Sequence, residues 1–180
     1  MSVLAAFWPF SRSRADADAA ALLAAVTQIS RQPCFFGEGR TPDTLQGRLE
    51  IMTLNAVLAF IRLESDPGAA PLAQAFADQL FRQFDAGLRE AGVGDLTVPK
   101  RMRKIAGAFY GRVKVYAEAL AAGDAAALEG AIARNLFGAE PGQAPFAVVL
   151  ADYALRNRVQ QGDADTSALF RLNGWASAPA

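Results

Sequence analysis

Apolar residues recur at helical spacing along most of the chain, and no stretch shows the strict alternation of a half-buried strand. The clearest repeat has one large apolar residue every four positions, at Leu72, Phe76, Leu80, Phe84 and Leu88. This spacing places all five on one helix face, as in a helix that packs against a core. The pattern predicts an all-α protein.

Proline, glycine and capping residues delimit the expected helices. We expect helices over 18–32, from Thr41-Pro42 to about 64, over 72–90, over 97–122, around 128–137, from Pro145 onward and around 167–172. A chain of 180 residues is long enough to enclose one core. We therefore predict a single compact domain of about six or seven helices over 18–175, with tails at 1–17 and 176–180.

The segment LEIMTLNAVLAFIRLE carries apolar residues all round the helix rather than on one face. A helix of this kind is normally buried on several sides, so we expect it at the centre of the domain. Asn55 lies within it and, once buried, needs a hydrogen-bond partner.

The composition excludes most catalytic and metal sites. The chain has no histidine and one cysteine, Cys34, so it lacks the commonest general base and cannot form an internal disulfide or a thiolate metal cluster. We predict that the protein is not an enzyme and has no cofactor or metal of its own. The formal net charge of zero argues against binding to DNA, but not against a local charged patch.

Positive charge is concentrated in the helix expected over 97–122. Six of the 18 basic residues fall between Leu96 and Ala117, where no acidic residue occurs. Four of them, Lys100, Arg101, Arg103 and Lys104, lie in the first two turns, where the helix dipole disfavours cations. An anionic partner would compensate for this arrangement: lipid headgroups, ribosomal RNA or an acidic protein surface. Alternatively, Asp85, Glu90 and Asp95 neutralise the cluster within the fold.

Two glycines in the same helix, Gly107 and Gly111, each cost about 1 kcal/mol relative to alanine. Their spacing of four, with Ala108 between them, forms a shallow groove that another helix can approach closely. The approaching helix belongs either to a partner or to this same domain. We expect Phe109, Tyr110 and Val113 on the opposite, apolar side.

The N-terminal segment is a candidate membrane contact. Aromatic residues precede two arginines, at Phe7, Trp8, Phe10, Arg12 and Arg14. Aromatic side chains favour the headgroup level and arginines favour anionic lipid, so the segment fits an interfacial anchor. The alternative is a tail that is disordered or packs onto the domain. The apolar run is much shorter than a transmembrane helix.

The stretch DQLFRQFDAGLREAGVGDLTVPKRMRKIAGAFYGRVKVYAEAL resembles the ubiquinol–cytochrome c chaperone family, most specifically over LREAGVGDLTVPKRMRKIAGAFYGR. Weaker similarity extends from about Thr41 to Arg158. The resemblance implies a non-enzymatic, all-α chaperone that binds newly made cytochrome b during assembly of the cytochrome bc1 complex, respiratory chain complex III. Mitochondrial members work with a small partner protein near the ribosome.

The chain looks like a compact bacterial-type member, so we expect it in the bacterial cytoplasm, with contact at the inner face of the cytoplasmic membrane left open. A ribosome contact and a small partner protein also stay open. The expected client and partner surface comprises Asp85, Arg89, Val93, Asp95, Lys100, Arg101, Arg103, Lys104, Gly107, Gly111, Arg112 and Lys114. The alternative functions are a ribosome- or RNA-docking module and a lipid-binding helical protein.

Overall fold

A computed structural model describes residues 14–162 and 164–179, which form six α-helices joined by loops and short helical turns. The α-helices are α1 (Arg14–Ser30), α2 (Leu45–Glu64), α3 (Ala70–Glu90), α4 (Val98–Ala122), α5 (Ala125–Ile132) and α6 (Pro145–Gly162). The short turns are η1 (Pro33–Phe35), η2 (Pro67–Ala69), η3 (Ala133–Phe137), η4 (Thr166–Phe170) and η5 (Leu172–Gly174). The predicted all-α class is confirmed.

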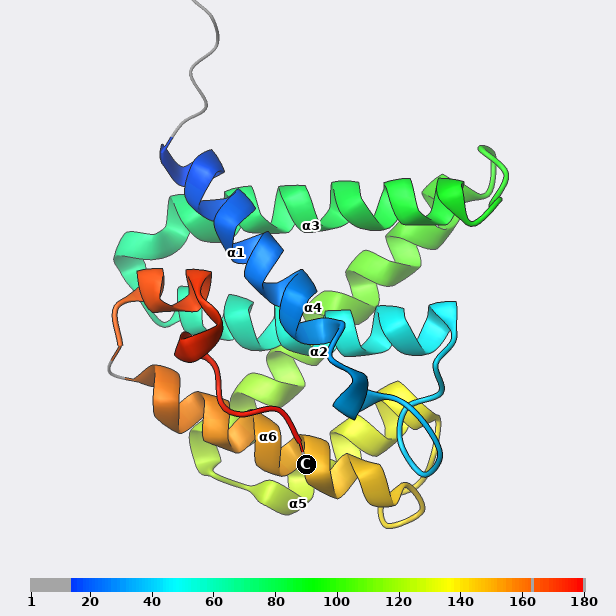
Figure 1. Ribbon diagram of the computed structural model, residues 1–180, viewed down its shortest axis with the longest axis vertical. Helices are drawn as coiled ribbons and strands as arrows, with labels where there is room; N and C mark the ends of the chain where they lie inside the picture. The colour runs from blue at the N-terminus through cyan, green and yellow to red at the C-terminus, as the bar shows by residue number, and fades with distance from the viewer. Residues whose placement is uncertain (1–13, 163, 180) are drawn as a thin grey trace, which may run out of the picture.

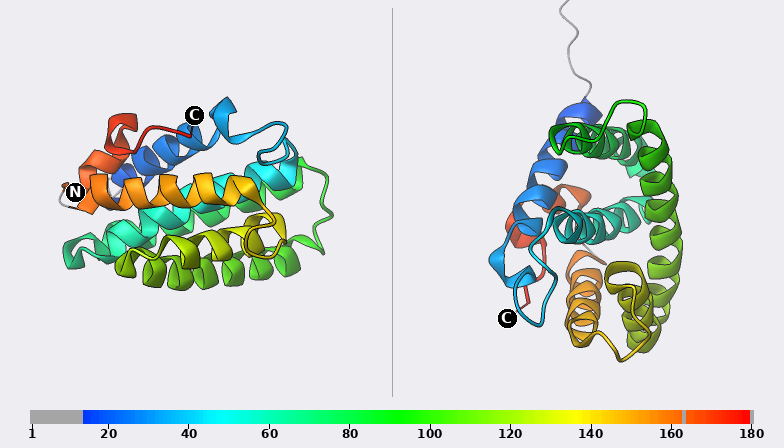
Figure 2. Two further views of the ribbon diagram at one scale, coloured as in Figure 1. Left: turned by 90° about the horizontal axis from the view of Figure 1, so that it is seen from below. Right: turned by 90° about the vertical axis from the view of Figure 1, so that its right-hand side faces the viewer.

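The helices form three layers. Helices α3, α2 and α6 lie side by side in the middle layer (Figure 1). Helix α1 and the C-terminal turns cover one side of this layer, and α4 and α5 cover the other (Figure 2). Helix α4 therefore has one face against the core and one face toward solvent.

Helix α2 is the centre of the core, as predicted. Every residue from Thr53 to Phe60 is buried, and α2 contacts α1, α3, α4 and α6. The predicted partner for Asn55 is present: its Nδ2 donates to Ser30 Oγ at 3.2 Å, and its Oδ1 accepts from the Tyr153 hydroxyl at 2.8 Å. The polar group in the core is thus hydrogen-bonded across three helices.

Helix α2 begins later than predicted. Thr41 is buried outside the helix, where its N–H donates to Phe35 O and its carbonyl accepts from Gly37 N. Thr44 is the actual N-cap and accepts from Gly47 N at 3.1 Å. The expectation that Thr41-Pro42 starts the helix is therefore wrong, because the backbone of Thr41 closes the preceding loop.

The turn between α3 and α4 is set by a glycine. Gly92 has φ of +80°, and its N–H donates to Arg89 O while Val93 N donates to Leu88 O. These two bonds form a Schellman motif, which requires the left-handed conformation that glycine adopts without strain. The motif fixes the direction in which the chain enters α4.

Two further boundaries differ from the expectation. Helix α1 begins at Arg14, four residues before the predicted start at Asp18. The helix expected to run to Phe137 changes after Ile132 into a π-helical turn, η3, that ends at Gly138. At the C-terminal end Trp175 and Ala176 are buried against the core.

Candidate docking surface on helix α4

The solvent-facing side of α4 carries a stripe of lysines and glycines. Its members, which we call the outer stripe, are Lys100, Lys104, Gly107, Gly111 and Lys114, and all five are exposed. Successive members are alternately four and three positions apart in the sequence, so they lie along one face of the helix. The same alternation is found where two helices pack along a seam.

Neither glycine of the outer stripe packs against another part of the domain. A Cβ added at Gly107 or Gly111 would have no contact within 4 Å. The alternative that these glycines admit a helix of the same domain is therefore wrong for the described residues. Their surface is open to an external partner.

The cations at the start of α4 are also unpaired. Within residues 14–162 and 164–179, no carboxylate lies within ion-pair distance of Lys100, Arg101, Arg103 or Lys104. All four side chains are exposed. The first turn holds no acidic residue that would offset the helix dipole. This end of α4 is thus a surface with uncompensated positive charge.

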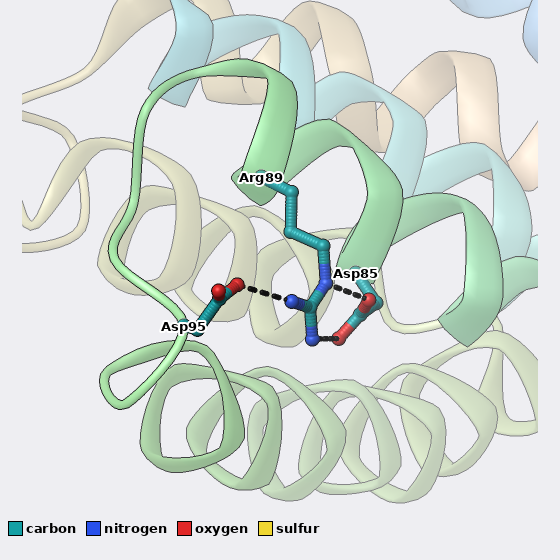
Figure 3. A network of polar contacts seen from close by, with 3 residues as sticks. All are labelled: Asp85, Arg89 and Asp95. Atoms are coloured by element: carbon teal, nitrogen blue, oxygen red, sulfur yellow. Dashed lines mark hydrogen bonds and ion pairs between the residues drawn. The ribbon is translucent and has the colours of Figure 1, made fainter.

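Two of the acidic residues that could have neutralised these cations bind a different arginine (Figure 3). Arg89 Nε lies 2.7 Å from Asp85 Oδ2, and Arg89 Nη1 lies 2.5 Å from Asp95 Oδ1. Asp85 and Arg89 belong to α3, whereas Asp95 belongs to the turn that also contains the half-buried Val93. The network connects α3 to the α3–α4 turn, and both carboxylates pair with Arg89 rather than with the α4 cations.

Arg112 lies inside the molecule, unlike the other α4 cations. Its Nη2 is 2.7 Å from Glu50 Oε2 of α2 and donates to the Asn135 carbonyl of η3 at 2.9 Å. Both charged side chains of the pair are only 11% exposed. Burial raises the pKa of Glu50, and the charge of Arg112 partly opposes that rise. Arg112 therefore joins α4 to α2 and η3 instead of contributing to the outer surface.

The aromatic side of α4 differs in one respect from the prediction. Phe109 and Val113 are buried, but Tyr110 is about half exposed. The Tyr110 ring packs edge-on against Phe109 at 5.4 Å between centroids, and also contacts the rings of Phe60 and Phe81. Tyr110 thus stands at the border between the core and the exposed face of α4.

A hollow that the sequence did not reveal lies next to this helix. Its volume is about 530 Å³, and its lining comes from the end of α1, the start of α2, the end of α3 and the start of α4. Arg101 and Ile105 are the residues that α4 contributes. In the sequence, Leu88 and Ile105 are indistinguishable from core positions, because periodicity does not show which apolar face lacks a neighbour.

Little of the predicted N-terminal contact falls within the described residues. Phe7, Trp8, Phe10 and Arg12 lie outside them, and Arg14 is exposed at the start of α1, 3.8 Å from Asp18. None of the described helices combines the length and the apolar character that crossing a bilayer requires.

The described residues also contain no group of three or more histidine, cysteine or acidic side chains that could hold a metal ion. Cys34 is half-buried, and burial raises the pKa of its thiol. A raised pKa reduces the thiolate fraction, so Cys34 is not activated as a nucleophile.

Comparison with known proteins agrees with the fold and with the family resemblance. The family model for the ubiquinol-cytochrome C chaperone matches residues 38–174. The crystal structure of the Cbp3 homolog from Brucella abortus is similar to this chain, with 36% sequence identity and a TM-score of 0.79. That similarity covers 92% of this chain and 93% of the Brucella chain. No curated protein matches the sequence.

Proposed function

Because the chain belongs to the ubiquinol–cytochrome c chaperone family, we propose that it is a non-enzymatic chaperone that binds newly made cytochrome b during assembly of the cytochrome bc1 complex. The family match over residues 38–174 is the observation that carries this proposal. The Brucella relative, similar over nearly its whole length, supports it.

We place the client on the outer stripe of α4. Its glycines leave open space where a helix backbone could approach, and its lysines lie on both sides of the two glycines. A client of apolar helices with polar flanks matches this pattern, because close packing favours small residues and the flanks need charge partners. Arg103 lies beside the stripe and would extend the cationic contact.

The site of action in this proposal is the bacterial cytoplasm, next to the inner face of the cytoplasmic membrane where cytochrome b is inserted. The unpaired cations at the start of α4 are equally available to ribosomal RNA. The exposed part of Tyr110, beside the same surface, adds an aromatic group that the sequence had placed on the apolar side. A ribosome-docking module is therefore the second candidate function.

The proposal is tested in a host strain that lacks the gene and is complemented with variants. A variant with Lys100, Arg103 and Lys104 all changed to glutamate should fail to restore the bc1 complex, seen as low haem b absorbance and loss of the complex on native gels. The matched control changes Arg82, an exposed arginine of α3, to glutamate and should restore assembly. Normal bc1 assembly in the strain without the gene would contradict the function. Normal assembly with the triple variant would contradict only the assigned surface.

A further inference from the structure

The hollow beside α4 has the dimensions and the lining of a small-molecule site. Its volume of about 530 Å³ lies within the usual range for such sites. The ends of all four helices from α1 to α4 contribute to its lining. Its apolar side chains are Leu45, Leu49, Met52, Phe84, Leu88 and Ile105.

The charged groups at the hollow are predominantly cationic. Arg31, Arg48 and Arg101 contribute to the lining, against a single carboxylate from Glu90. Arg48 pairs with Asp43 at 2.6 Å, whereas Arg31 and Arg101 are exposed and have no ion pair within the described part of the chain. Two guanidinium groups are therefore free to bind an anion beside an apolar space.

The charge pattern argues against the chain itself as the occupant. The apolar N-terminal segment carries Arg12 and Arg14 and has no acidic residue before Asp16, so it would bring positive charge to a cationic hollow. The outer stripe of α4 in a second copy of the chain is also positively charged, so it does not complement the hollow either. The complementary ligand is apolar along most of its length and negative at one end.

We propose that this hollow binds a fatty acid, with the acyl chain against the apolar lining and the carboxylate at Arg101. Arginine binds carboxylates through paired hydrogen bonds, which are stronger than those between neutral groups. Burial of the acyl chain against side chains such as Leu49 and Ile105, which the domain buries only partly, favours binding. This site is separate from the outer stripe and does not depend on the client proposed above.

The test uses the purified full-length chain and a fluorescent probe, dansyl-undecanoic acid. The probe should bind saturably and be displaced by palmitate, whereas methyl palmitate should displace it at least about tenfold less well, because it lacks the charge that arginine recognises. Arg101→Gln should weaken probe binding, and Arg103→Gln, two residues along α4 and outside the hollow, should bind as the original chain does.

A second variant separates binding from folding. Leu45 is 61% exposed at the first residue of α2, so Leu45→Glu should leave the fold intact, since an acidic residue is favourable at a helix N-terminus. It should nevertheless repel the fatty acid. Equal displacement by palmitate and its ester, or unchanged binding in both Arg101→Gln and Leu45→Glu, would overturn the proposal. Binding of an acidic amphipathic peptide without any binding of the probe would also overturn it, in favour of a protein partner.

Discussion

Among single residues, the buried Glu50–Arg112 pair is an interaction whose loss the domain should tolerate poorly. The two side chains join helices α2 and α4, and the same arginine reaches the carbonyl of Asn135. A buried charge is stable only while its partner remains, because water cannot replace the lost interaction. The pair therefore contributes to how α4 is held against the core, whatever binds to its outer face.

Arg112→Met should lower the free energy of unfolding by about 3–5 kcal/mol at neutral pH, because it leaves the buried Glu50 carboxylate without its charge partner and with only a hydrogen bond from Gln46. Burial already raises the pKa of Glu50, and loss of Arg112 should raise it further. The folded state then binds a proton that the unfolded state has released, so stability falls as pH rises through the raised pKa. The loss should accordingly be smaller in acid.

Denaturant unfolding over a series of pH values measures both effects. The double variant Glu50→Gln with Arg112→Met should recover most of the lost stability and should lose most of the pH dependence, because it removes the buried carboxyl group. A loss below about 1 kcal/mol that does not vary with pH would show that solvent reaches the pair, as it does in exposed ion pairs.

Among the helices, α4 has one face that packs into the core and one that is free to bind a partner. Phe109 and Val113 pack into the core, while the outer stripe faces solvent. The glycines of the stripe weaken an exposed helix without satisfying any contact in the domain. A sequence feature that costs stability and serves no internal packing is expected at a functional surface.

The glycines provide a direct test of that interpretation. Gly107→Ala and Gly111→Ala should each raise the free energy of unfolding by up to about 1 kcal/mol, since the added methyl groups meet open space. Gly107→Leu and Gly111→Leu should keep the fold but reduce the amount of cytochrome b that co-purifies with the chain, because a larger side chain prevents close approach of a helix.

Gly87 of α3 is the matched control for these changes. It also lies within a helix and has no contact within 4 Å of an added Cβ, so Gly87→Ala should stabilise the fold to a similar degree. Gly87→Ala should not change the amount of cytochrome b that co-purifies with the chain. If the leucine variants in α4 retained as much cytochrome b as the original chain, the glycines would not form the client contact.

The helices could be predicted because their signals are local. The apolar repeat of α3, Pro99 in the first turn of α4 and the stop at Gly123 all lie within a few residues of the element they define. The start of α2 could not be predicted, because Thr41 is used by a loop bond to Phe35 rather than by the helix. The π-helical turn after Ile132 gave no recognisable signal either.

The docking surface on α4 was only partly predictable, because some of its contacts join residues that are distant in the sequence. Lys100, Lys104 and the two glycines could be assigned to one exposed face from spacing alone. Spacing did not show that Arg112 pairs with Glu50, since their contact joins residues 62 positions apart in the sequence. The hollow forms where the ends of four helices meet, so it cannot be predicted from the sequence of any one helix.

At the scale of the whole molecule, α4 separates two surfaces of different chemistry. Its outer stripe is cationic and contains two glycines, whereas its Arg101 and Ile105 line a hollow that α1, α2 and α3 also border. The Schellman motif at Gly92 and the Arg89 network hold the turn from which α4 starts. A client on the outer stripe and a ligand in the hollow could thus be bound at the same time.

Docking of cytochrome b on the outer stripe is tested most directly by photo-crosslinking in the native host. A photoreactive amino acid would replace Lys104 or Gly111, and the control position would be Val148, which is exposed on α6. We predict cytochrome b adducts at Lys104 and Gly111 and none at Val148. Adducts with ribosomal components alone, or equal yields at all three positions, would contradict the claim.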